Sequence, residues 1–153
     1  MVATTTMERT PRMQSKIHLE QTFPHPRAKV WRALTEPALM QKWGMRPEGF
    51  APVVGTKFKL VDDGPHTGWR GFVVCEVLAA EHERVLKMSW VGDDKDPPHT
   101  VTYTLADDGA GTRLTLDHEG FQGIGGFITN KLFLTPGWKS LMRTKLLAVL
   151  VGD

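Results

Sequence analysis

The segment of residues 137–150 is the feature that most constrains the fold, because its apolar side chains recur at helical spacing. The residues that share this apolar stripe are Trp138, Leu141, Met142, Leu146 and Val149. The basic side chains of Lys139, Arg143 and Lys145 lie largely off the stripe. A helix with one apolar side must bury that side, so the rest of the chain has to supply a complementary surface.

Strand-like runs with turn residues between them predict that this surface is a curved antiparallel sheet. The runs span residues 16–23, 56–61, 69–79, 84–91, 99–106 and 112–119. Period-two alternation in the last three runs places one set of side chains on a single, mostly apolar face. This set comprises Leu86, Met88, Trp90, Val101, Tyr103, Leu105, Leu114, Leu116 and His118. Residues 69–79 are apolar on both faces, so alternation does not orient that run.

Two short helices are expected between the first strand and the rest of the sheet. Pro26 can occupy the first turn of a helix, where its missing N–H costs nothing, and apolar residues follow it at helical spacing. Pro37 ends this helix and can open a second one. Farther along, Gly123, Gly125 and Gly126 predict a flexible turn or hinge rather than a strand or a phosphate-binding loop.

Length and composition fit one domain that needs no metal or disulfide to stabilise it. The chain has 153 residues, of which 41% are apolar and 24% charged, and Cys75 is its single cysteine. Residues 1–15 lack the apolar core of a signal peptide and are expected to form a disordered tail before one domain over residues 16–153. No run is long enough to span a bilayer, and a net charge of +2 does not predict a nucleic-acid partner. We therefore expect a cytoplasmic protein.

The expected fold is α+β, with the sheet curved around the long C-terminal helix and a cavity between them. Bulky side chains directed into this space are the candidates for contacting a ligand. These candidates are Trp43, Phe58, Met88, Trp90, Tyr103, Leu105, Leu116, His118, Phe127, Trp138 and Met142. Tyr103 and His118 are polar groups on an otherwise apolar wall, and such sparse groups orient a buried ligand. Trp31 and Trp138 are expected to contribute mainly to packing.

The sequence offers few groups that could perform catalysis. His118 and Glu119 are adjacent on a strand and point to opposite faces, so they do not form an acid–base pair. His118 alone could contact a ligand, act as a general base or be a hydrogen-bonded histidine at the cavity rim. Cys75 lies in a strand and is expected to be a small buried thiol rather than a nucleophile. No catalytic residue is therefore assigned.

A metal site is weakly supported by the pattern of potential ligands. His18 and Glu20 share a face of the first strand, and His99 and Asp117 are the residues that could join them. Their predicted faces disagree, and none of these residues has a metal-binding spacing. A surface ladder of charges is favoured instead, and neither a metal nor another cofactor is assigned.

Several segments together resemble the SRPBCC or START-like superfamily, and within it the branch related to the activator of the 90-kDa heat-shock-protein ATPase. They are residues 26–37 with Trp43 after them, Gly55 with Phe58, residues 86–90, residues 112–121, and Gly137 with Trp138. The resemblance covers about residues 15–151. It implies a helix-grip fold of the START and Bet v 1-like kind, with a deep cavity for hydrophobic or aromatic ligands. The chain is most similar to small bacterial single-domain members, without the second domain that eukaryotic chaperone activators carry.

These observations predict a protein that binds a small hydrophobic, aromatic or lipid-like molecule without covalent chemistry. The scaffold alone does not determine the function, because the superfamily includes carriers, cyclases and chaperone regulators. One alternative is an interaction module for a chaperone or another protein, which would use the basic C-terminal helix or a strand edge. A second alternative is an enzyme of the cyclase or hydrolase kind that uses the same cavity. An exposed sheet edge could also support a homodimer.

Overall fold

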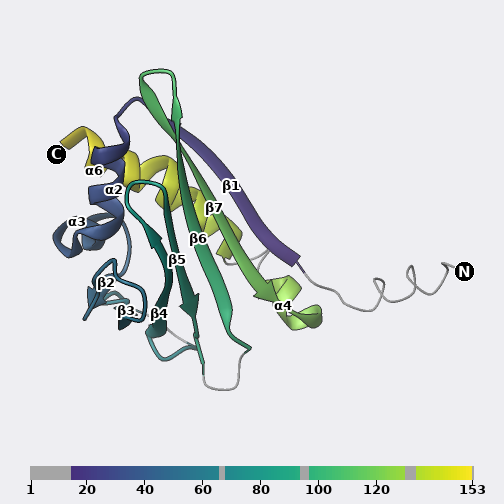
Figure 1. The fold of residues 1–153 in the computed structure, drawn as a ribbon. Coiled ribbons are helices and arrows are strands. Elements are labelled where there is room, and N and C mark those ends of the chain that lie inside the picture. The colour runs from purple at the N-terminus through teal and green to yellow at the C-terminus, as the bar shows by residue number, and fades with distance from the viewer. Residues whose placement is uncertain (1–14, 66–67, 94–96, 130–133, 153) are drawn as a thin grey trace, which may run out of the picture.

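The computed structural model describes residues 15–65, 68–93, 97–129 and 134–152. Seven antiparallel strands form one sheet in the spatial order β1-β7-β6-β5-β4-β3-β2, so the first and last strands of the chain lie side by side (Figure 1). The strands are β1 Ser15–Phe23, β2 Arg46–Glu48, β3 Lys57–Val61, β4 Phe72–Glu81, β5 Val85–Trp90, β6 His99–Asp108 and β7 Gly111–Phe121. The predicted curved antiparallel sheet is confirmed.

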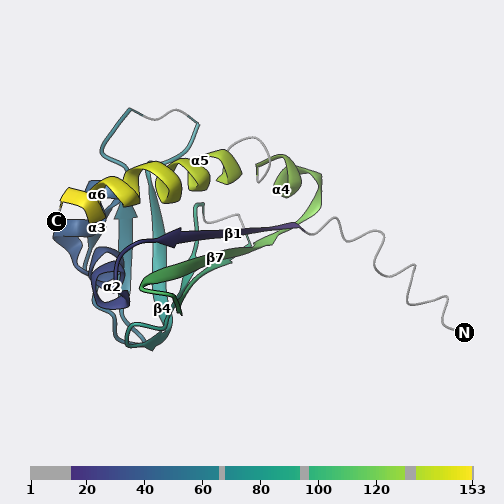
Figure 2. The ribbon, with the colours of Figure 1, turned by 90° about the horizontal axis from the view of Figure 1, so that it is seen from above.

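Two short helices follow β1, as the two prolines predict. Helix α2 Arg27–Thr35 begins after Pro26, and helix α3 Pro37–Trp43 begins at Pro37 itself. Pro37 has no N–H to donate to a carbonyl four residues earlier, so α2 cannot continue through it. Both helices pack against the end of the C-terminal helix (Figure 2). They therefore close one end of the space between that helix and the sheet.

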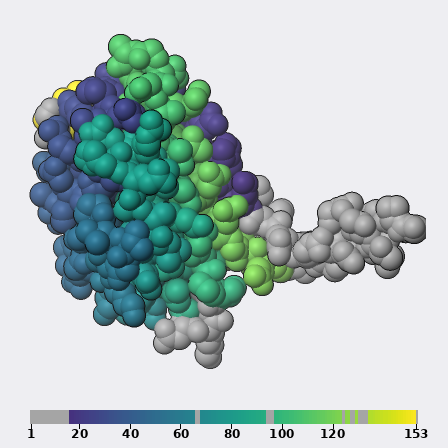
Figure 3. All heavy atoms as spheres, in the orientation of Figure 1, coloured from purple at the N-terminus to yellow at the C-terminus, as the bar shows by residue number. Residues whose placement is uncertain are grey.

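The C-terminal helix lies across the inner face of the sheet (Figure 2). It is one helical segment made of α5 Thr135–Ser140, the π-helical turn η3 Leu141–Lys145 and α6 Leu146–Gly152. Its buried side chains recur every four residues and are Trp138, Met142, Leu146 and Leu150. A spacing of four drifts around an α-helix, which has 3.6 residues per turn, and the wider turn of η3 reduces that drift. From the outer side of the sheet this helix is almost completely hidden (Figure 3).

Alternation along the strands separates a buried inner face from a solvated outer face. All the inner-face residues predicted on β5, β6 and β7 are buried. Strand β4, which alternation does not orient, directs Val73, Cys75 and Val77 inward and leaves Val74 and Leu78 exposed. The helix-grip arrangement implied by the resemblance is thus confirmed, with the sheet curved toward the C-terminal helix.

The predicted turn or hinge at Gly123 is wrong, because the structure has a helix there, α4 Gly123–Thr129. Gly123 enters this helix with a φ of +68°, a conformation that favours glycine. Gly126 lies against the backbone of Phe121, where an added Cβ would be 3.2 Å from the carbonyl carbon. These two glycines therefore permit the tight connection from β7 into α4 and its close packing.

Strand β2 is a second difference, since no strand is predicted there from the sequence. It has only three residues, one of them a proline, and is defined by its antiparallel pairing with β3 at the sheet edge. Residues 1–14 lie outside the described residues, so the expected disordered tail stays a prediction. In the described part of the chain, the helices are all too short or too polar to cross a membrane.

Candidate ligand pocket beneath the C-terminal helix

A pocket of about 660 Å³ lies between the C-terminal helix, α3 and the inner face of the sheet. Small-molecule sites typically have volumes of about 300–1,000 Å³, so this one is large enough for a ligand. The apolar and aromatic residues that line it are Leu34, Met40, Trp43, Met45, Leu60, Val61, Met88, Trp90, Tyr103, Trp138 and Leu141. They come from both sides of the interface, and the predicted cavity between sheet and helix is present.

The pocket brings together part of the predicted set of ligand-contacting residues. The candidates that line it are Trp43, Met88, Trp90, Tyr103 and Trp138. Those that are buried elsewhere in the core are Phe58, Leu105, Leu116, His118 and Met142. The side chain of Phe127 lies outside the described residues. Inward direction on a strand therefore identified core residues reliably, but it did not separate the pocket wall from the packed interior.

Trp43 owes its position to the break between the two short helices. The indole Nε1–H of Trp43 donates a hydrogen bond to the carbonyl oxygen of Ala33 at 2.7 Å. This carbonyl would otherwise accept from the residue four positions later, but that residue is Pro37, which has no N–H. The bond satisfies a carbonyl at the end of α2 and holds the Trp43 ring at the pocket.

Tyr103 stands between two indole rings in the pocket wall. Its ring lies edge-on to Trp43 at 6.4 Å and to Trp138 at 6.2 Å between centroids. Only 5% of the Tyr103 surface is exposed, and burial raises the pKa of its phenol above the usual range. The hydroxyl forms no hydrogen bond with any residue in the described ranges. It is therefore a neutral donor available to a ligand in this pocket.

Trp138 connects the pocket wall to a polar chain behind it. Its indole Nε1–H donates to Nδ1 of His118 at 3.0 Å, and Nε2 of His118 lies 3.0 Å from Nδ1 of His99. Because an indole N–H can only donate, Nδ1 of neutral His118 is an acceptor and its proton must be on Nε2. The Nε2–H of His118 then donates to His99. Both ring nitrogens of His118 are thus satisfied by protein groups.

His118 is held in its neutral form by its surroundings. The side chain is completely buried, and burial together with the nearby His99 lowers the pKa of His118 to about 3. His118 does not line the pocket. It contacts the indole nitrogen of Trp138, which does line it. These observations favour the hydrogen-bonded structural histidine among the three roles that the sequence left open.

Charged side chains lie at the mouth of the pocket, and three of them are joined by ion pairs. Arg46 donates to both carboxylate oxygens of Asp63, at 2.7 and 3.0 Å, and to Glu48 at 2.7 Å. The hydrogen bonds with Asp63 raise the pKa of Arg46, and those from Arg46 lower the pKa of Asp63. Two lysines, Lys42 and Lys145, line the same pocket. Sequence reasoning missed these rim residues, because they come from elements far apart in the chain.

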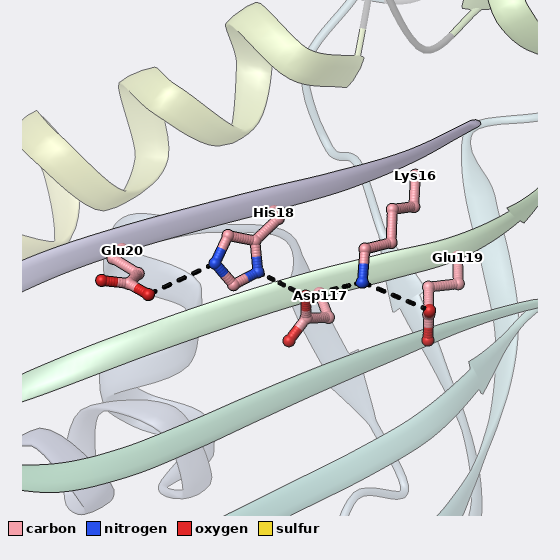
Figure 4. Close-up of polar contacts among 5 residues, drawn as sticks. All are labelled: Lys16, His18, Glu20, Asp117 and Glu119. Carbon is pink, nitrogen blue, oxygen red and sulfur yellow. Dashed lines mark hydrogen bonds and ion pairs between the residues drawn. The ribbon is translucent and has the colours of Figure 1, made fainter.

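The outer face of the sheet carries a ladder of charged residues along β1 and β7 (Figure 4). Its members, called the outer ladder below, are Lys16, His18, Glu20, Asp117 and Glu119. Nδ1 of His18 lies 2.7 Å from Asp117 and Nε2 lies 3.3 Å from Glu20, and these hydrogen bonds raise the pKa of His18. The predicted surface ladder is confirmed. No group of potential metal ligands occurs among the residues that the structure describes.

Cys75 has the environment expected of a structural thiol. It is buried on the inner side of β4, and desolvation raises its pKa to about 12. The thiolate, which is the nucleophilic form, is therefore disfavoured at neutral pH.

Comparison with protein families identifies one that spans most of the chain. The family model described as "Activator of Hsp90 ATPase homolog 1-like protein" matches residues 24–150. A comparison with curated proteins found no match.

Several solved structures share this fold. Protein MLL2253 from Mesorhizobium loti is 31% identical with a TM-score of 0.78, and the alignment covers 91% of this chain and 98% of that one. CalU16 from Micromonospora echinospora is 24% identical with a TM-score of 0.70, over 92% of this chain and 78% of CalU16. DynU16, a protein in the dynemicin biosynthetic locus, is 24% identical with a TM-score of 0.72, over 89% of this chain and 47% of DynU16. The likeness to the last two concerns the fold alone.

Proposed function

The chain belongs to the family of activator of Hsp90 ATPase homolog 1-like proteins, and from this premise we propose that it binds a small hydrophobic, aromatic or lipid-like molecule beneath its C-terminal helix. One observation carries the proposal. A pocket of about 660 Å³ has aromatic walls formed by Trp43, Trp90, Tyr103 and Trp138 and contains a phenol hydroxyl that has no hydrogen-bond partner among the described residues. An apolar cavity with a few polar groups is the usual form of a small-molecule site.

Apolar contact would supply most of the affinity. Burial of about 300 Å² of ligand surface, at about 25 cal/mol per Å², contributes about 7 kcal/mol before the cost of association. The Tyr103 hydroxyl would add one hydrogen bond, worth about 1 kcal/mol, and would orient a ligand that carries an acceptor. Shape and apolar area therefore dominate, which favours a broad range of ligands with similar bodies.

Titration with N-phenyl-1-naphthylamine, a neutral dye whose fluorescence rises in apolar sites, tests the proposal. We expect saturable binding of one dye per chain. The substitution Leu141→Trp adds bulk to the pocket wall and should weaken binding at least about tenfold, a loss of about 1.4 kcal/mol. Val151→Trp places the same side chain at an exposed position of α6 outside the pocket and should leave affinity unchanged.

The proposal fails if the parent protein shows no saturable binding, or if the two tryptophan variants bind the dye equally well. Native mass spectrometry of protein purified from its own host provides an independent measurement. A co-purified small molecule that is lost from Leu141→Trp and kept in Val151→Trp would identify the ligand directly.

An interaction module remains the second candidate, because the family description names an activator of the Hsp90 ATPase. The exposed Lys139 and Arg143 on the C-terminal helix are the basic residues that such a partner could contact. A stoichiometric chaperone complex that is lost in the double variant Lys139→Glu and Arg143→Glu would favour this function. Retention of dye binding in that variant would separate the two activities.

A further inference from the structure

Two lysines mark the mouth of the ligand pocket. Lys42 is in the last turn of α3, and Lys145 is the last residue of η3. Both line the main pocket, and both also line an adjoining hollow of about 300 Å³ formed with Ala148, Val149 and Gly152. Helix α3 packs against η3 and α6, which brings the two lysines to one site although they are far apart in sequence.

Lys42 and Lys145 differ from the arginine of the same pocket in their ion pairing. Neither forms an ion pair with a residue in the described ranges, whereas Arg46 at the same pocket is paired with Asp63 and Glu48. Asp62 is the remaining acid that lines the pocket, and its carboxylate accepts a hydrogen bond from the Gly64 N–H at 3.0 Å. Among the described residues, the mouth therefore presents two lysines without an ion pair and one carboxylate, that of Asp62, which keeps its negative charge.

This arrangement would favour a ligand with a negative charge at the outer end of an apolar body. Resting on the proposed function, we propose that the pocket selects an amphipathic anion. Its carboxylate, sulfonate or phosphate group would lie beside Lys42 and Lys145, and its apolar body would contact Trp43 and Trp138. Two like charges that border one hollow repel each other, and an anion bound there relieves the repulsion while gaining attraction from both. Both lysines are exposed, so salt screens this attraction.

A pair of dyes that differ by one charged group tests the inference. The anionic dye 1-anilinonaphthalene-8-sulfonate has the same aromatic body as neutral N-phenyl-1-naphthylamine and adds a sulfonate. We expect the parent protein to bind the anionic dye about tenfold more tightly, as two partly exposed charge pairs would give. Raising NaCl from about 0.05 M to about 0.5 M should weaken binding of the anionic dye and leave binding of the neutral dye nearly unchanged.

Substitutions locate the source of the preference. The double variant Lys42→Gln and Lys145→Gln should bind the two dyes with nearly equal affinity, because the preference for the anionic dye depends on these two charges. Lys139→Gln removes an exposed charge of the same helical segment outside the pocket and should keep the parent preference. Thermal melting checks that each variant is folded.

The possible outcomes separate this inference from the proposed function. Equal binding of both dyes by the parent overturns the inference and leaves the proposed function standing. Unchanged preference in the double variant, or its loss in Lys139→Gln, also overturns the inference, because the anion would then bind elsewhere. Absence of saturable binding by either dye would reject the inference and the proposed function together.

Discussion

Asp117 and His118 are neighbours in β7, yet they lie in opposite environments on the two faces of the sheet. Asp117 is on the outer face, where its carboxylate contacts His18 in the solvated outer ladder (Figure 4). His118 is on the inner face, completely buried, with Trp138 and His99 bonded to its two ring nitrogens. Successive residues of a strand point to opposite faces, so Asp117 lies in a solvated network of charged groups and His118 lies in a buried network of neutral groups.

The two environments shift the pKa values of their histidines, His118 and His18, in opposite directions. His118 has a lowered pKa because desolvation disfavours its charged form, whereas His18 has a raised pKa because two carboxylates favour that form. On the inner face each ring nitrogen of His118 depends on one fixed partner, and losing that partner leaves an unsatisfied buried group. On the outer face water and salt replace a lost partner at small cost. Substitutions on the inner face should therefore lower the free energy of unfolding more than substitutions on the outer face.

The largest effect is expected from Trp138, which both lines the pocket and donates to His118. Trp138→Ala should lower the free energy of unfolding by about 3–5 kcal/mol, because it removes a large buried side chain and its hydrogen bond. Trp138→Phe keeps most of the ring and should cost less, about 1–3 kcal/mol, mainly through the unsatisfied Nδ1 of His118. Urea denaturation of the parent and both variants measures these values.

A matched pair makes this prediction specific to the inner network. Trp69 is partly exposed, and Trp69→Ala should cost much less than Trp138→Ala. If Trp138→Phe were as stable as the parent, the hydrogen bond to His118 would contribute nothing measurable. The contrast between the inner and outer networks would then rest on packing alone.

A smaller effect is expected from acidification. The pKa of His118 is lowered from 6.5 to about 3 in the folded protein, so its neutral form stabilises the fold above about pH 6.5. This contribution is lost as the pH falls from 6.5 toward 3, because the unfolded chain takes up the proton first. Between about pH 7 and about pH 5 the loss should be about 2 kcal/mol.

Measuring the free energy of unfolding against pH in the parent and in His118→Gln isolates the contribution of His118. The variant should lose less stability over this pH interval, whatever its stability at neutral pH. His18, with its raised pKa, works in the opposite direction and is unchanged in the variant. Parallel pH curves for the two proteins would contradict the assignment of a neutral, buried His118.

The inner network also shows how far sequence alone could lead. Alternation placed His118, Tyr103 and Trp90 on one face because the side-chain period of a strand is a local property. The apolar stripe of the last helix was equally visible. The bond from Trp138 to His118 was not, because it joins a helix to a strand and depends on how the two elements pack.

The pocket was predictable as a feature of the fold but not in its outline. Which inward side chains contact one another and which border a cavity depends on packing across elements, so Leu105 and Leu116 look the same in sequence as Met88. The lysine pair was missed for the same reason. Strand β2 was missed because three residues carry no periodic signal, and α4 was missed because glycine has a low helix propensity.

The smallest effect is expected on the outer ladder, where Asp117→Asn removes the carboxylate closest to His18. The pKa of His18 should fall toward 6.5, because the hydrogen bond that His18 donates to Asp117 is the main cause of its increase. The stabilisation by protonated His18 is present below about pH 6.5 and is lost as the pH rises through the folded-state pKa. Removing it should cost less than about 1 kcal/mol even at low pH, since His18 is half exposed and its ion pairs are screened.

NMR titration of the His18 ring protons gives this pKa directly in the parent, in Asp117→Asn and in Glu20→Gln. Glu20 lies at the longer distance of 3.3 Å, so its substitution should lower the pKa of His18 less than the loss of Asp117. A stability loss at Asp117 as large as that at Trp138 would break the contrast between the faces, because a solvated ladder would then be holding the sheet together as strongly as the buried network does. A small loss of stability with a clear fall in the pKa of His18 would instead show that carboxylates can set the charge of a surface histidine while contributing little to the stability of the fold.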